Sequence, residues 1–320
     1  MQSKKSNNME EFTPSDEFLY SIWNFYEASL SASTRKNYYN VVKGYIKIVG
    51  KEPLSLTYED VSKYYKYLEA RMSSGRLSYS TALMRISVMR SLCEYIRHRN
   101  NLAGKDYINY FNEIILPEPD KSISDELLPS EQELNNLLEI INASKDAMTF
   151  LICSLILKCG LTTSELSGLE AEYIILDNNN NLCIQFPAKR KITRIIRLPK
   201  DISQLLYAYM DEMQIFSGPL FYNKHHTKLK VRDAERLLKK YIKQCIEHNL
   251  ITQEFTMQTM RHAAIKYMLL GGAGEDEVAE YCGITTKWMS RYRRVISENS
   301  ALKSADMSII SIKTNKTSSL

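Results

Sequence analysis

The sequence predicts a mainly α-helical protein of two domains, with a small three-stranded antiparallel β-sheet in the second domain. Three observations predict this fold class. Apolar residues recur at helical spacing over most of the chain, three short β-type runs lie between residues 173 and 198, and a Pro-rich polar stretch covers residues 116–130. A length of 320 residues suits two domains of ordinary size.

The first domain is expected over residues 15–116, after a flexible, polar N-terminal arm of residues 1–14. Each of its helices begins near a residue whose side chain can accept a hydrogen bond from the first helical turn, and Gly50 is placed to end the second helix. Apolar residues then recur every three or four positions, so each helix has one face for a shared core. The expected helices begin near Asp16, Ser33, Thr57 and Ser78, and a shorter segment covers residues 105–116.

Residues 117–129 are the expected linker between the domains. This stretch contains three prolines together with acidic residues and serines, a composition typical of stiff, exposed connections. The second domain is expected over residues 130–299, and a polar tail of residues 300–320 follows it.

The second domain combines helices with the predicted sheet. Ser130 and Glu133 form a capping-box pattern that starts its first helix. The next expected helix, residues 146–159, is apolar on all sides and is therefore expected in the core. The three predicted strands cover residues 173–176, 182–186 and 192–198, and further helices are expected near residues 200–214, 230–247, 256–270, 275–282 and 286–297.

Composition excludes several classes of protein. Hydrophobic residues make up 44% and charged residues 25% of the chain, as in a soluble globular protein, and 11 Gly with 8 Pro exclude a collagen-like chain. The longest apolar stretch, residues 147–161, is too short to span a membrane, and the N-terminus lacks the apolar run of a secretory signal. We therefore expect a cytoplasmic protein with no membrane partner.

The cysteines and histidines do not have the spacing of a metal site. No two of the six cysteines form a C-x-x-C pair, and the five histidines include only the adjacent pair His225 and His226, whose side chains point in different directions. We expect reduced core thiols, no metal and no cofactor.

The net charge of +5 is mild, but the positive charge is concentrated in three segments. Residues 71–99 contain six arginines and a single acid, residues 188–197 contain five basic residues and no acid, and a third cluster covers residues 224–243. Arginine binds phosphate through two parallel hydrogen bonds, so this bias favours a nucleic-acid backbone over a merely solvated helix face. The residues expected to contact double-stranded DNA are Arg71, Arg76, Arg85, Arg90, Arg97, Lys189, Arg190, Lys191, Arg194, Lys228, Lys230, Arg232 and Arg261.

Three motifs in the second domain carry a resemblance to a known family. Residues 159–169 read CGLTTSELSGL, residues 257–262 read MQTMRH, and residues 281–284 read YCGI and are followed by Tyr292. In this order, and around a three-stranded sheet, they resemble the G-L-R-x-S-E-L, H-x-L-R-H and L-G-H boxes and the nucleophile segment of the tyrosine recombinases, also called phage integrases. The stretch between the third box and Tyr292 is one residue shorter than the family pattern.

The resemblance implies a clamp around a DNA duplex, with a core-binding, SAM-like domain at residues 15–116 and a catalytic-like domain at residues 130–299. It also implies chemistry in which a tyrosine attacks a phosphodiester, two arginines hold the phosphate oxygens, and histidines and a lysine move protons. The positions that match the family's catalytic residues are Glu165, Lys189, Arg261 and Tyr292, whereas Thr162, Gln258 and Ile284 stand where the family has an arginine and two histidines.

These three replacements remove groups on which that chemistry depends. Loss of one transition-state donor typically slows a reaction by ~10²–10³, and loss of a general acid–base group by about 10²–10⁴, although such losses do not simply multiply. We therefore expect a sequence-specific DNA-binding regulator, most simply a transcriptional repressor that maintains phage lysogeny, on a scaffold that no longer cleaves DNA. On the same motifs, the chain also resembles the recombinase-fold master repressors of SPbeta-like temperate phages of Bacillus.

Two other functions stay open at this point. One is an active but atypical integrase that uses Tyr292 as nucleophile and takes a substitute cation from Lys158, Arg190 or Arg194. The other is an accessory architectural subunit of an active recombinase. The matching residues also have structural interpretations: Tyr292 as a packed phenol, Arg261 and Lys189 as contacts to the DNA backbone, Glu165 as a helix cap and His262 as a buried, hydrogen-bonded histidine.

The expected partners are double-stranded DNA, a second copy of the chain, and an antirepressor protein or peptide. Self-association is expected through the C-terminal segment, residues 298–320, whose one apolar patch is Met307 to Ile310. The family implies a bacterial host, in which the protein would be associated with the nucleoid.

Overall fold

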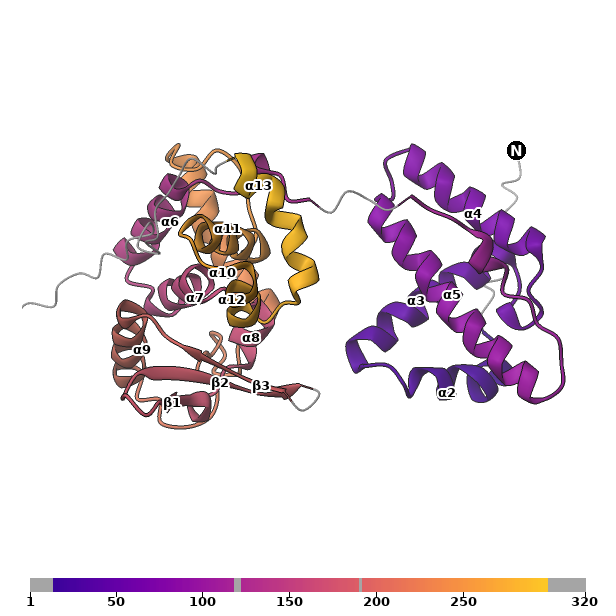
Figure 1. The fold of residues 1–320 in the computed structure, drawn as a ribbon, viewed down its shortest axis with the longest axis horizontal. Helices are drawn as coiled ribbons and strands as arrows, with labels where there is room; N and C mark the ends of the chain where they lie inside the picture. Colours follow the sequence, from indigo (N-terminus) through magenta and orange to yellow (C-terminus); the bar gives the residue numbers. More distant parts are fainter. Residues whose placement is uncertain (1–13, 118–121, 190–191, 299–320) are drawn as a thin grey trace, which may run out of the picture. The chain divides into compact units, whose positions relative to one another are not determined.

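The computed structural model describes residues 14–117, 122–189 and 192–298. Within these ranges most residues are helical, and three strands form one antiparallel sheet (Figure 1). The expected fold class is therefore confirmed. The chain divides into two units, residues 1–120 and 121–320, and each is described by itself.

The first unit is helical, and its helices Tyr58–Ser73 and Tyr79–Leu102 begin at residues whose side chains cap them, whereas the helix expected to open at Ser33 begins at Ala32 without a side-chain cap. Thr57 and Asp60 form a capping box, and the Ser78 hydroxyl accepts a hydrogen bond from the N–H of Thr81 at 3.3 Å. Gly50 ends a helix with a φ of 90°, which glycine adopts without strain. The elements are α1 (Asp16–Phe18), the π-helical turn η1 (Leu19–Trp23), α2 (Asn24–Glu27), α3 (Ala32–Val49), η2 (Pro53–Ser55), α4 (Tyr58–Ser73), α5 (Tyr79–Leu102) and η3 (Tyr110–Glu113).

Three aromatic rings form the centre of the first unit. Tyr45, Tyr64 and Phe111 are fully buried and pack edge to face, with ring centroids 5.2, 5.9 and 6.2 Å apart. Arg90 of α5 adds a polar connection, because its Nε donates to the Phe111 carbonyl at 3.2 Å and its Nη2 to the Ile114 carbonyl at 2.8 Å. This arginine therefore holds the end of the first unit against α5.

Helix α7 (Ala147–Cys159) is the centre of the second unit. Every residue from Thr149 to Cys159 is buried, as expected for a helix that is apolar on all sides. Helix α7 packs against α6, α9, α10 and α11 (Figure 1). The helical elements of this unit are η4 (Asp125–Leu127), α6 (Glu131–Ala143), α7, α8 (Thr163–Gly168), η5 (Ala171–Tyr173), α9 (Lys200–Glu212), α10 (Val231–Glu247), α11 (Met257–Leu270), α12 (Glu275–Cys282), η6 (Thr286–Tyr292) and α13 (Arg293–Glu298).

The sheet has the order β1-β2-β3, with β1 (Ile174–Leu176), β2 (Leu182–Lys189) and β3 (Ile192–Arg197) all antiparallel to their neighbours. Ile184 is central, since it pairs with Ile174 on one side and Ile196 on the other. The register shifts between Phe186 and Lys189, close to the basic turn. All three strands lie where the sequence predicts them.

The segment before α6 differs from the exposed linker that the sequence predicts. Ile123 and Leu128 are buried, and the N–H of Ile123 donates to the Arg291 carbonyl at 2.9 Å. The Lys266 ammonium also pairs with Asp125. The expectation of an exposed connection is therefore wrong at Ile123 and Leu128, which pack in the apolar cluster of α11 and α12, whereas Glu126 and Leu127 are exposed and residues 118–121 lie outside the described part of the chain.

All six cysteines are buried, and none is in a disulfide, as expected for core thiols. Within the described ranges, no helix is both long and apolar enough to cross a membrane.

The packing of residues 122–129 can be tested with two neighbouring leucines. Leu128 is 7% exposed and Leu127 is 66% exposed. We expect Leu128→Ala to lower the free energy of unfolding of the second unit by about 2–4 kcal/mol, because it leaves a cavity. The matched control Leu127→Ala should change it by less than about 0.5 kcal/mol. Urea unfolding followed by circular dichroism measures both, and equal effects would contradict the packing.

Candidate functional site

The three sequence boxes meet at one buried arginine of the second unit. Arg261 of α11 is only 6% exposed. Its Nε donates to the carbonyl of Gly160, at the end of α7, and its Nη2 donates to the carbonyl of Cys282, at the end of α12, each at 2.6 Å. The second box therefore ties the first box to the third. This side chain was expected to contact DNA, but its Nε and Nη2 donate to the protein's own backbone.

Thr162 begins helix α8 as its N-cap. Its backbone N–H and its hydroxyl donate to Glu165 Oε2 at 2.8 and 2.9 Å, and its hydroxyl accepts from the Glu165 N–H at 3.1 Å. This is the reciprocal capping box that a Thr-x-x-Glu sequence favours. The position therefore stabilises a helix start, and its side chain supplies no positive charge.

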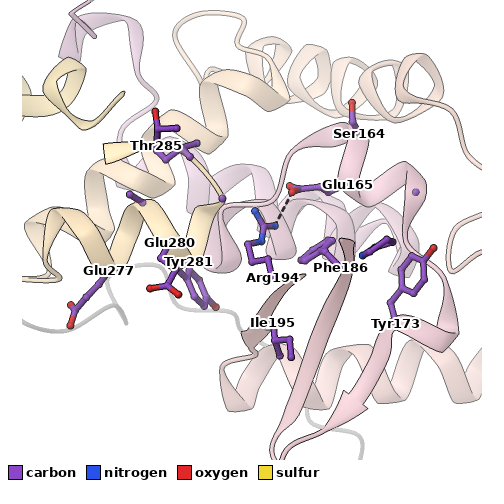
Figure 2. Close-up of a pocket in the computed structure, with 15 residues that line it drawn as sticks. Ser164, Glu165, Tyr173, Phe186, Arg194, Ile195, Glu277, Glu280, Tyr281 and Thr285 are labelled. Carbon is purple, nitrogen blue, oxygen red and sulfur yellow. Dashed lines mark ion pairs between the residues drawn. The ribbon is translucent and has the colours of Figure 1, made fainter. Parts of the chain in front are cut away.

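The side chain that brings a positive charge to the start of α8 belongs to the sheet. Arg194 of β3 forms an ion pair with Glu165, with Nη2 and Oε1 2.8 Å apart (Figure 2). Its guanidinium lies over the Phe186 ring, 4.3 Å from the centroid. It also lies against Gly283, where an added Cβ would collide with Nη1. Arg194 thus contacts β2, α8 and the residue that ends α12.

Tyr292 is buried and hydrogen-bonded. Its side chain is 1% exposed, and its hydroxyl lies 2.6 Å from His262 Nδ1. The other ring nitrogen of His262 lies 3.0 Å from the side-chain nitrogen of Gln258. Tyr292, His262 and Gln258 therefore form one hydrogen-bonded series across α11 and η6. His262 is hydrogen-bonded as the sequence predicts, but it is half-buried.

Burial shifts the pKa values of His262 and Tyr292 so that both side chains favour their neutral forms. Burial, with Arg291 and Arg261 nearby, lowers the pKa of His262 to about 4. Burial also raises the pKa of Tyr292, although Arg261 and Arg291 oppose this shift. A phenol that stays protonated is a weak nucleophile until a base takes its proton, and the neutral imidazole of His262 lies in position to accept that proton.

Ile284 and Gln258 complete the three positions that differ from the family pattern. Ile284 is half-buried against the apolar cluster of α11 and α12, and its side chain has no hydrogen-bond donor. Gln258 is exposed in the first turn of α11 and bonds to His262. Neither side chain can serve as a general acid or base.

The arginines expected to contact DNA in the first unit have different environments. Arg90 is engaged by two backbone carbonyls, and Arg97 pairs with Glu94. Arg71 and Arg85 are half-buried, and Arg76 is exposed. Arg71 lies over the Tyr67 ring, 5.8 Å from its centroid, and Arg85 lines a cavity of about 510 Å³ with Lys47 and Tyr64. Of this set, Arg90 is the one whose hydrogen bonds give it a structural role.

The basic residues of the second unit also separate into groups. Lys230 and Arg232 are exposed at the start of α10, and Lys228 forms an ion pair with Glu170 at 2.7 Å. Lys189 ends β2 and pairs with Ile192 in the ladder, but its side chain lies outside the described part of the structure. Arg190 and Lys191 also lie outside the described residues.

A fourth basic segment is not among the three that the sequence was expected to use for DNA binding. Residues 287–294 contain Lys287, Arg291, Arg293 and Arg294 and no acid. Within it, the Arg291 guanidinium lies over the half-exposed Trp288 ring, 4.4 Å from the centroid. The local excess of basic residues was a usable signal. By contrast, no local pattern pairs Arg194 with Glu165, which are far apart in the chain.

A cavity of about 830 Å³ lies beside the Arg194–Glu165 pair (Figure 2). Its walls come from α8, from β2 and β3, and from α12 with the residues that follow it. Glu277 and Glu280 stand on the α12 side, opposite the sheet (Figure 2). Among the described residues, no group of three or more His, Cys, Asp or Glu side chains is arranged to hold a metal ion.

Comparison with known proteins agrees with this arrangement. Residues 129–297, more than half of the chain, match the phage integrase family, and residues 24–100 match the N-terminal SAM-like domain of phage integrases. The chain belongs to the phage integrase family. This family member is 24% identical over 277 residues to the tyrosine recombinase XerC of Syntrophus aciditrophicus (strain SB), which covers 80% of this chain and 85% of that protein.

Two solved structures show the same fold. The site-specific recombinase XerH bound to a palindromic difH substrate, a post-cleavage complex, gives a TM-score of 0.63 at 15% identity, over 90% of this chain and 85% of that one. Lambda integrase (residues 75-356) bound to DNA gives a TM-score of 0.61 at 15% identity, over 86% of this chain and 96% of that one. At these identities the likeness establishes the fold alone.

The half-buried His262 of this integrase-family chain predicts a pH dependence of stability. Its pKa is lowered from 6.5 to about 4, so below 6.5 the unfolded chain takes up a proton that the folded chain does not. The free energy of unfolding should therefore fall as the pH drops through this window. We expect the stability difference between wild type and His262→Asn to be largest at neutral pH and to shrink near the lower pKa.

Urea unfolding at several pH values measures this difference. His248→Asn, at an exposed position that ends α10, is the matched control. A stability difference that stays constant over the whole window would contradict the assigned environment of His262.

Proposed function

We propose that the chain is a sequence-specific double-stranded DNA-binding regulator, most simply a transcriptional repressor that maintains phage lysogeny, on a tyrosine-recombinase scaffold that does not cleave DNA. The observation that carries the proposal is Thr162, which stands at the family's arginine position and is engaged as the N-cap of α8, so it supplies no charge to a phosphate. The regulatory part of the proposal rests on the resemblance to the recombinase-fold repressors of SPbeta-like phages, which depends on the same three motifs.

The residues around Tyr292 support the absence of cleavage. Thr162 is occupied as a helix cap, Ile284 is apolar, and Arg261 donates to two backbone carbonyls. Each lost donor or acid–base group would lower a cleavage rate by about 10²–10³ or more. Together these replacements remove the arginine and the two histidines on which the family's chemistry depends.

Exposed basic side chains support the DNA-binding part of the proposal. Arg76 in the first unit and Lys230 and Arg232 in the second are exposed, and arginine and lysine contacts to phosphate provide most of the affinity for a duplex. We propose residues 15–116 as the core-binding domain and 130–299 as the catalytic-like domain of the clamp, since the family matches fall within or nearly within these ranges. Proteins with the same fold have been solved bound to DNA.

Partners besides DNA follow from the family. A lambda integrase dimer bound to a core site has the same fold, with a TM-score of 0.62 at 14% identity, which supports self-association of this chain. We propose that residues 298–320 take part in it. An antirepressor that releases the regulator, and action at the nucleoid of a bacterial host, belong to the same proposal.

The alternative is an active but atypical recombinase that uses Tyr292 as its nucleophile. The name of the XerC relative favours it, since that protein is a recombinase. The two functions differ in one product, which is a covalent bond between Tyr292 and DNA.

A nicked suicide substrate distinguishes the two functions. The substrate carries a binding site selected by the protein from random-sequence duplexes. We expect no covalent protein–DNA adduct on a denaturing gel, because Thr162, Gln258 and Ile284 stand in place of the arginine and the two histidines that the family uses. Tyr292→Phe should bind the same duplex with unchanged affinity. An adduct that appears with wild type and vanishes in Tyr292→Phe would establish the recombinase instead.

Two arginines of the first unit should respond differently to the same substitution. Arg76→Gln removes an exposed charge, so it should weaken DNA binding and lower the slope of log affinity against log salt by about one, with unchanged stability. Arg90→Gln removes donors from two buried carbonyls, so it should lower the free energy of unfolding by about 1–3 kcal/mol. Mobility shifts over a salt series and urea unfolding measure the two effects, and the reverse pattern would contradict the assignment.

A further inference from the structure

We propose that Arg194 is a phosphate-binding residue of this site, brought from strand β3 to replace the charge missing at Thr162, and that Glu165 is the counter-ion it exchanges for a DNA phosphate. The inference rests on the proposed DNA-binding function. It assigns a residue and a partner to a contact that the family boxes do not place there.

The first argument is the geometry of Glu165. Thr162 holds one oxygen of this carboxylate, Oε2, through two hydrogen bonds at 2.8 and 2.9 Å. Only the other oxygen, Oε1, faces Arg194. A guanidinium has a planar fork of donors that suits two acceptor oxygens, so Glu165 satisfies it at a single point.

The second argument is the unused donor capacity of Arg194. Its Nε and Nη2 atoms are buried, and neither makes a well-directed hydrogen bond within the described residues, although Nη2 is in ion-pair distance of Glu165. Buried donors without partners are unfavourable. The two non-bridging oxygens of a phosphodiester have the spacing of the guanidinium N–H groups. A phosphate can therefore accept hydrogen bonds from the donors that Glu165 does not engage.

The third argument is that Arg194 is held in place by packing. The ring of Phe186 lies under its guanidinium at 4.3 Å, and the α-carbon of Gly283 lies against Nη1. A side chain on residue 283 would displace the guanidinium. The cation is therefore positioned before any ligand arrives, which lowers the entropy lost on binding.

The fourth argument is the position of Arg194 relative to Arg261. Arg261 donates to the Cys282 carbonyl, and Arg194 lies against the next residue, Gly283. Burial raises the pKa of the Cys282 thiol to about 11, and Arg261, Arg194 and Glu165 all act on that thiol electrostatically. Two guanidinium groups thus converge on one turn.

The last argument is access. Arg194 and Glu165 are 16% and 17% exposed, and both line the cavity of about 830 Å³ between α8, the sheet and α12 (Figure 2). Both side chains are thus partly open to this space, whereas Nε and Nη2 of Arg194 are themselves buried. A phosphate therefore reaches these donors only when the Glu165 carboxylate gives up its place, which is the exchange proposed.

Charge-neutralising substitutions test the exchange. Glu165→Gln frees Arg194 and keeps the helix cap, since glutamine also serves in a capping box. We expect this variant to bind a random-sequence duplex about threefold to tenfold more tightly, with a salt slope steeper by about one. Arg194→Gln should bind about tenfold more weakly, with a slope shallower by about one. In the double variant the gain from Glu165→Gln should disappear.

The other ion pair of strand β3 supplies the matched control. Arg197 pairs with Asp177 at 2.7 Å. Asp177→Asn removes the same charge as Glu165→Gln and reports the general effect of net charge on DNA affinity. An equal gain in Asp177→Asn and Glu165→Gln would overturn the proposal.

A purely structural ion pair gives a different result. In that case Glu165→Gln and Arg194→Gln would both lower the melting temperature and would leave the salt slope unchanged, and the proposal would be wrong. Arg194→Lys provides a further readout: it keeps the charge but not the fork, so it should restore the slope and only part of the affinity.

The failure of this inference is distinguishable from failure of the proposed function. If wild type forms a covalent adduct with DNA, the regulator proposal fails whatever the variants do. If wild type binds the duplex with steep salt dependence but Glu165→Gln leaves the binding unchanged, only the role of Arg194 is overturned. Wild type that binds no duplex overturns both.

Discussion

The second unit depends on one buried charge, the Arg261 guanidinium. It connects the end of α7 to the end of α12 by donating to the carbonyl groups of Gly160 and Cys282. Carbonyl groups at the C-terminal end of a helix have no partner within the helix, so they need a donor from elsewhere. A buried cation is tolerable only when its hydrogen bonds are met, and here the backbone meets them. The positions of Gly160 and Cys282 relative to α11 follow from this contact, and so does the placement of Gly283, Ile284 and the turn that carries Tyr292.

Near Arg261, two side chains of the family boxes, Thr162 and His262, make hydrogen bonds that stabilise the local structure. Thr162 uses its hydroxyl to cap α8, and His262 uses a ring nitrogen to hold the Tyr292 hydroxyl. The first contact stabilises the start of a helix, and the second fixes the position of the Tyr292 ring. The fold does not require the family's catalytic side chains, because the same helices and strands form with Thr162, Gln258 and Ile284 at those positions.

The fold was predictable because its signals are local. Helix caps such as Thr57 and Ser130, the all-apolar pattern of α7 and the alternation near β2 each specify an element from a few neighbouring residues. The site was predictable only in part. The environment of Arg90 depends on the carbonyl of Phe111, and that of Arg194 on Glu165, and such pairings arise from tertiary packing. The burial of Ile123 was missed for the same reason, since three prolines near it indicated an exposed linker.

The hydrogen bond from Ile123 to the Arg291 carbonyl joins the segment before α6 to the turn that carries Tyr292. Ile123, Leu128 and Tyr292 also belong to one apolar cluster with residues of α11 and α12. The segment that precedes α6 is thus one wall of the packing around the phenol, and a protein trimmed to begin at Ser130 would expose that cluster to water.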